Sequence, residues 1–84
     1  MSANTVGPTV EQLTAFGRAW NSDLTYRQTD KIVEHVNALR QLGGKEPVKG
    51  LLPGYTRWGG IPSQELRVEL YTSAVALGFF RSAV

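Results

Sequence analysis

Residues 61–80 read IPSQELRVELYTSAVALGFF, and the helix that they predict organises the rest of the chain. Helical spacing places four apolar side chains in one row: Leu66, Leu70, Ala74 and Leu77. Three further apolar residues widen this row past half of the circumference: Val68, Tyr71 and Val75. A helix with one side in water needs an apolar stripe of only about 100°. The sequence therefore predicts a central helix, over residues 61–78, that packs between two partners.

The ends of this helix carry their own signals. Pro62 suits the first helical position, and Glu65 in the first turn lies near the positive end of the helix dipole. Gly78 is a natural terminator, because glycine readily takes the left-handed conformation that closes a helix.

Two Thr-x-x-Gln sequences, which begin at Thr9 and Thr25, have the form of capping boxes. They predict helices over residues 9–21 and 25–42. Because the connection over residues 21–24 is short, we expect the two helices to form an antiparallel pair. The predicted fold is all-α, a small three-helix domain whose core is Leu13, Phe16, Trp20, Ile32, Val36, Leu39, Leu66, Leu70, Ala74 and Leu77.

Gly17 lies within the apolar face of the first predicted helix. A glycine in a helix interior costs about 1 kcal/mol relative to alanine. Two interpretations stay open: a tolerated defect or, as we prefer, a place where another backbone crosses closely.

The long connection over residues 43–60 holds six of the nine glycines and two of the four prolines. It shows neither a helical nor an alternating pattern, and structureless loops of this length in compact domains are often functional. We expect it to lie across one end of the helices.

The candidate partner-binding residues of this loop are basic or aromatic: Lys45, Lys49, Tyr55, Arg57 and Trp58. Trp, Tyr and Arg dominate protein-binding hot spots, and aromatic rings beside cations also stack on nucleic acid bases. A third interpretation makes Tyr55 and Trp58 a lid over the core, with Arg57 merely solvated. Phe79 and Phe80 join the candidate site, because two adjacent side chains at a helix end cannot both face one core. One of them is expected to pack under the loop or on a partner.

Catalytic and metal sites are not expected. His35, the only histidine, falls at the edge of an apolar arc and is predicted to be half-buried and structural. Glu65 and Glu69 lie one turn apart, on a predicted solvated face or in a salt bridge to a neighbouring chain. The chain has no cysteine, and no nucleophile elbow, zinc motif or dinucleotide fingerprint occurs. We therefore expect no enzyme activity, no metal and no cofactor.

The 84 residues fit a single domain, over residues 1–84, with a net charge of +2. The sequence predicts an extended segment, or lead-in, over residues 1–8. It lacks the basic start and the apolar run of a signal peptide. No apolar run approaches the roughly 18 residues that span a bilayer. We expect a soluble chain, without membrane contact, that works in the cytoplasm or within a virion.

Three function classes stay open. The favoured one is a structural or protein-interaction subunit of a larger assembly, such as a viral particle, with other subunits or further copies of this chain as partners. The second is a small inhibitor of the kind that phages encode, docked on one protein target. The third and least favoured is a nucleic-acid-binding accessory protein that uses Arg40, Lys45, Lys49 and Arg57 as a basic strip.

Overall fold

The computed structural model describes residues 7–81, which form three α-helices and no strand. The helices are α1 (Val10–Arg18), α2 (Tyr26–Leu42) and α3 (Gln64–Leu77), joined by a π-helical turn η1 (Ala19–Asp23) and a 3-10 turn η2 (Trp58–Gly60). The all-α prediction is confirmed. The predicted lead-in lies outside the described residues except for Gly7-Pro8.

Both capping boxes form as predicted. In the first, the Gln12 backbone N–H donates to Thr9 Oγ1 over 3.1 Å, and the Thr9 N–H donates to Gln12 Oε1 over 2.8 Å. The same reciprocal pair joins Thr25 and Gln28 at the start of α2. These boxes satisfy backbone donors that a helix start otherwise leaves unpaired.

Of the two predicted ends of α3, the C-terminal one is confirmed. Gly78 closes the helix with a φ of 82°, in the left-handed region, as expected. The predicted start is two residues early, because α3 begins at Gln64 and not at Pro62. Ser63 is the N-cap: its hydroxyl accepts a hydrogen bond from the Leu66 N–H over 3.1 Å. Serine is a preferred N-cap residue, because its side-chain oxygen satisfies a backbone donor of the first turn.

The first helix also ends earlier than predicted. After Arg18 the backbone widens into η1, where the Leu24 N–H donates to the Ala19 carbonyl over 2.8 Å. This wider turn presents Trp20 and Asn21 to the long loop. Trp20 Nε1 donates to the Thr56 carbonyl over 2.7 Å, and Asn21 Oδ1 accepts from the Trp58 N–H over 2.8 Å.

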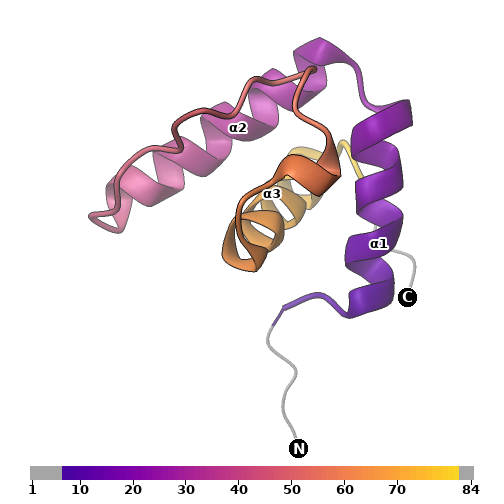
Figure 1. Ribbon diagram of the computed structural model, residues 1–84. Coiled ribbons are helices and arrows are strands. Elements are labelled where there is room, and N and C mark those ends of the chain that lie inside the picture. Colours follow the sequence, from indigo (N-terminus) through magenta and orange to yellow (C-terminus); the bar gives the residue numbers. More distant parts are fainter. Residues whose placement is uncertain (1–6, 82–84) are drawn as a thin grey trace, which may run out of the picture.

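The predicted antiparallel pairing of the first two helices is wrong. Figure 1 shows α3 between α1 and α2, and it is α3 that packs against each of them. The partner of α2 is α3, which runs antiparallel to it: His35 meets Ser73, and Arg40 meets Glu69 further along. The apolar stripe of α3 is wide enough to receive both neighbours, so α3 is the central helix that its sequence predicts.

Eight of the ten predicted core residues are buried. The exceptions are Leu39, which is 49% exposed, and Leu77, which is 36% exposed. The buried side of α2 is centred on Ile32 and Val36, which leaves Leu39 at its edge, and Leu77 is the last residue of α3. The core also contains residues that were not predicted: Ala19, Val33, Ile61 and Tyr71, together with the buried polar residues Thr29 and Ser73.

The long loop does not lie across one end of the helices. It runs back along the length of α2, as Figure 1 shows. Arg40 Nε donates to the Glu46 carbonyl over 2.7 Å, and Asn37 Oδ1 accepts from the Val48 N–H over 2.8 Å. Farther along, the Tyr55 ring contacts that of Tyr26, near the start of α2. Side chains of α2 therefore guide a loop that has little secondary structure of its own.

Candidate functional site

The outer side of the α2–α3 pair carries apolar side chains that are exposed or lie at the edge of the core. Helical spacing puts Leu39 and Leu42 on one side of α2, and Val68, Thr72 and Val75 in one row of α3. We call these five residues, with Ala76, the α2–α3 face. Leu42 is 84% exposed and Val75 is 38% exposed, while Val68 is half-buried.

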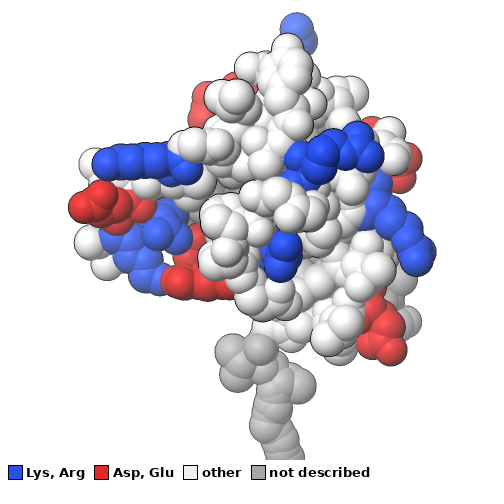
Figure 2. Space-filling view, viewed as in Figure 1, with Lys and Arg blue, Asp and Glu red and all other residues white. Residues whose placement is uncertain are grey.

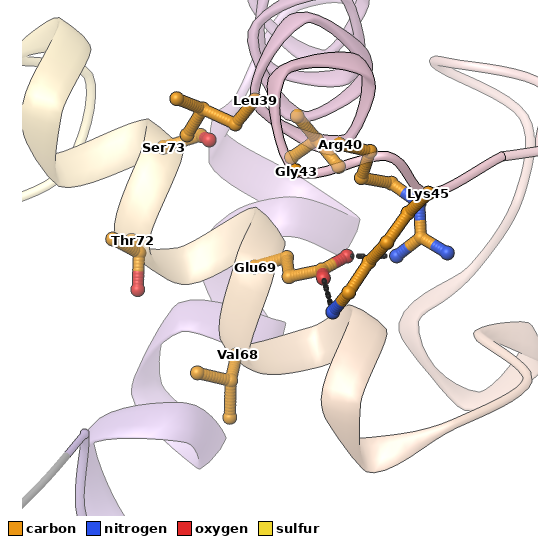
Figure 3. A pocket seen from close by; sticks show the side chains of 9 residues that line it. Leu39, Arg40, Gly43, Lys45, Val68, Glu69, Thr72 and Ser73 are labelled. Carbon is orange, nitrogen blue, oxygen red and sulfur yellow. Dashed lines mark hydrogen bonds and ion pairs between the residues drawn. The ribbon is translucent and has the colours of Figure 1, made fainter. Parts of the chain in front are cut away.

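A groove of about 320 Å³ opens between the two helices within this face. Figure 3 shows Leu39 and Arg40 of α2 across the groove from Val68, Glu69 and Thr72 of α3, with Lys45 of the loop at one end. Apolar side chains of both helices, among them Leu39 and Val68, line it together with the charged groups of Arg40, Lys45 and Glu69. This combination suits an apolar side chain of a partner better than a charged one.

The charged end of the groove is a closed ion-pair network. Arg40 Nη1 lies 2.6 Å from Glu69 Oε1, and Lys45 Nζ lies 2.7 Å from Glu65 Oε2 and 3.8 Å from Glu69 Oε2. Glu65 lies on the expected solvated face, with its side chain 62% exposed, and the salt bridges of both glutamates join residues of this chain. Figure 2 shows charges of both signs together where α2 ends and the loop begins. Lys45 and Glu65 are exposed, so their pair contributes little stability, whereas the Arg40 and Glu69 side chains are only 22% and 23% exposed. Together the pairs neutralise the groove end.

The Lys45–Glu65 pair makes a testable electrostatic prediction. The hydrogen bond from Lys45, and then its charge, lower the pKa of the Glu65 carboxyl, and Glu65 raises the pKa of Lys45 in return. Because the folded-state pKa of Glu65 is depressed, the pair stabilises the fold above the unfolded-state pKa and loses that effect as the pH falls through the folded-state pKa. In an NMR titration, Lys45→Gln should raise the pKa of Glu65 toward its ordinary value.

The matched control for this titration is Lys49→Gln. Lys49 lies 3.6 Å from Glu46 in a separate exposed pair, so its loss should leave the pKa of Glu65 unchanged. Equal titration of Glu65 in the wild type and in Lys45→Gln would contradict the ion pair.

His35 bonds to α3 and is half-buried, as predicted. Its Nδ1 lies 2.8 Å from the Ser73 hydroxyl oxygen, and the tautomer of the ring decides which group donates. Ser73 is fully buried, so its hydroxyl is closed to a substrate. The pair is a polar bond between α2 and α3.

The seven residues predicted to bind a partner do not come together in one place. Trp58 packs against the core, with its ring centre 5.2 Å from that of Phe16, and the Arg67 guanidinium lies 5.8 Å from the Trp58 ring. Trp58 therefore takes the lid position over the core. Tyr55 does not share it: this residue is 73% exposed and contacts Tyr26 on the surface.

Gly17 explains how Trp58 fits. A Cβ atom at this glycine would lie 2.6 Å from Trp58 Nε1. The predicted close approach is real, but the approaching group is an indole ring and not a backbone.

The other predicted site residues are spread over the surface and the core edge. Phe80 lies beside Phe16 and Tyr71, with ring centres 5.2 and 5.8 Å away, and Phe79 also packs at the edge of the core. The expectation that one of the two phenylalanines packs elsewhere is wrong, because the chain leaves the helix at Gly78 and turns back over the core. Lys45 and Lys49 are the paired cations described above, and Arg57 is exposed.

The residues of the α2–α3 face were missed as a site. Sequence periodicity assigned Leu39 to the core and gave Leu42 no separate role. The available signal was the absence of charged residues from 70–77, which leaves the outward positions of this helix without charge.

Comparison with protein-family models, with curated proteins and with solved structures gave no match. Within residues 7–81, no helix is long and apolar enough to cross a membrane. The same residues contain no group of three or more histidine and carboxylate side chains placed to hold a metal ion. The function must therefore be argued from the surface of this chain.

Proposed function

We propose that this chain is a non-catalytic protein-interaction subunit whose α2–α3 face binds another protein. The main support for this proposal is that Leu39, Leu42 and Val75 are exposed beside an apolar groove. Contiguous exposed apolar surface marks interaction sites in soluble proteins. The sequence supports the same proposal, because residues 70–77 of α3 contain no charged side chain even though several of them face outward. A helix side that stays in water normally carries charges.

Within this class we favour a subunit of a larger assembly, such as a viral particle, over a small inhibitor of one target. Its support is a second apolar surface on another side of α2. There the rings of Tyr26 and Tyr55 meet at 5.6 Å, and the exposed Leu52 belongs to the same loop. Two separate surfaces suit a subunit with two neighbours, whereas an inhibitor of one target needs only one.

The nucleic-acid alternative has weaker support. Three cations of the proposed basic strip lie beside carboxylates: Arg40, Lys45 and Lys49. Phosphate binding depends on cations that are available to replace counterions. Only Arg57 of that strip has no carboxylate within ion-pair distance among residues 7–81.

The test is a double substitution, Leu42→Lys with Val75→Lys, in the full chain. Both residues lie in the last turns of their helices, where the dipole favours a positive charge, so the fold should survive. The tagged chain is purified from the cells in which it naturally occurs. We expect the wild type to carry a protein in fixed stoichiometry and the double variant to lose it.

The control variant is Val10→Glu. Val10 is 75% exposed at the first position of α1, where an acidic residue is favoured by the dipole. It should keep the bound protein. A wild-type chain that is recovered alone, or a bound protein that survives the double substitution, would contradict the proposal.

A further inference from the structure

The hydrogen bond between His35 and Ser73 joins α2 to α3 inside the fold. His35 Nδ1 lies 2.8 Å from the Ser73 hydroxyl oxygen, and Ser73 has no exposed surface. Ser73 also borders the groove between the two helices. The Arg40–Glu69 pair joins the same helices farther along. Two polar contacts of different chemistry therefore connect α2 and α3 beside the groove.

The buried hydroxyl decides which of the two groups donates. A serine hydroxyl carries one hydrogen, and a buried donor that finds no acceptor is costly. Within residues 7–81, Nδ1 of His35 is the only hydrogen-bond partner of the Ser73 hydroxyl. Ser73 must therefore donate to Nδ1, and a ring nitrogen accepts only when it has no hydrogen of its own. His35 is then neutral and carries its hydrogen on Nε2.

The charged groups around the imidazole are paired with one another. On α2, Lys31 stands one turn before His35, and Glu34 is the preceding residue, about 100° around the helix; these two side chains meet at 3.9 Å. On α3, Glu69 lies one turn from the hydroxyl and pairs with Arg40. Among residues 7–81, no carboxylate lies within ion-pair distance of the ring to hold a proton on it.

We infer that the His35–Ser73 bond is a proton-sensitive joint, which holds α2 to α3 while His35 is neutral and weakens when the ring is protonated. Imidazole is the side chain that gains a proton as the pH falls from about 8 to about 5. A hydrogen on Nδ1 removes the acceptor and leaves the buried Ser73 hydroxyl with an unpaired donor. In the unfolded chain both groups are hydrated, so protonation has no such cost. The helix pair should therefore be more stable at neutral pH than in mild acid.

The joint gives the α2–α3 face a means of responding to pH. Because Ser73 borders the groove, the helices lose a contact beside it when His35 is protonated. The Arg40–Glu69 pair contains no histidine, so the helices should loosen locally rather than separate. This inference goes beyond the proposed function, because it concerns the two helices themselves and not what covers them.

The first measurement is urea unfolding of the full chain at about pH 7.5 and about pH 5.5, which span most of the histidine titration. His35 is the only histidine, so comparison with His35→Gln separates its effect from that of groups common to both chains. Between these pH values, the folding equilibrium constant of the wild type should fall about three- to fivefold more than that of His35→Gln, the size of one hydrogen bond. An equal change in the two chains would overturn the inference.

Ser73→Ala tests the cause of this effect. It removes the buried donor that protonation leaves unpaired, and alanine favours a helix, so the fold should survive and most of the pH effect should disappear. Thr29→Val is the matched control: Thr29 is also buried, but its hydroxyl donates over 2.8 Å to the Tyr26 carbonyl, which does not titrate. The control should keep the wild-type pH effect. A full pH effect in Ser73→Ala would contradict the joint.

The second measurement locates the hydrogen on the ring. Nitrogen-15 NMR of the imidazole distinguishes a ring nitrogen that carries hydrogen from one that accepts a hydrogen bond. At the higher pH, Nε2 of His35 should carry the hydrogen and Nδ1 should be the acceptor. A ring with its hydrogen on Nδ1 would overturn the inference, even if unfolding depended on pH.

Discussion

Leu70→Ala should lower the free energy of unfolding by about 2–5 kcal/mol, the cost of emptying a buried leucine site. Leu70 has no exposed surface and belongs to the core that α3 shares with both other helices. Because domains of this size are stable by only about 5–15 kcal/mol, the loss is a large part of the total. The measurement is urea or thermal unfolding, followed by circular dichroism.

Leu77→Ala is the matched control for this substitution. It removes the same atoms from the same helix, but Leu77 is 36% exposed at the helix end. Its effect should be clearly smaller. An unfolding midpoint for Leu70→Ala equal to that of the wild type would contradict the central position of α3.

The helices and their caps were predictable because their signals are local. A Thr-x-x-Gln box needs only side chains three residues apart, and both boxes close as predicted. Gly78 likewise ends α3 through its own backbone freedom. Where two local signals competed, as Pro62 and Ser63 did, the side chain that makes a hydrogen bond set the helix start.

The loop was not predictable because its path depends on side chains far away in the sequence. Asn37 and Arg40 hold its first half, while Trp20 and Asn21 hold its second half. None of these contacts leaves a periodic pattern in residues 43–60. Composition therefore identified a long connection correctly but placed it in the wrong part of the fold.

The candidate site was mispredicted for a related reason. Aromatic and basic residue types drew attention to the loop, yet Trp58 packs against the core of this chain. Conversely, helical periodicity assigned Leu39 to the core although about half of its surface is exposed. An apolar stripe has the same period whether its own chain or a partner covers it. Only the three-dimensional arrangement separates the two cases.

Gly17→Ala should destabilise the wild-type protein by about 1–3 kcal/mol, the usual cost of overpacking. The new Cβ would lie 2.6 Å from Trp58 Nε1, so the indole ring must move. Its movement weakens the ring contacts with Phe16 and Trp20, whose centres are 5.2 and 6.2 Å away. These losses oppose the gain of up to about 1 kcal/mol that alanine gives over glycine in a helix.

The sign of this effect should reverse when Trp58 is absent. Trp58→Ala by itself removes a ring that covers the core and should be destabilising, but it also clears the space above Gly17. In that background Gly17→Ala should be stabilising, because only the gain in helix propensity is left. Unfolding of the wild type, the two single variants and the double variant measures the coupling directly. Additive effects would show that Trp58 does not rest on Gly17. A reversed sign of the Gly17→Ala effect would show that Gly17 provides the space for the indole ring. Trp58 would then hold the end of the loop against α1.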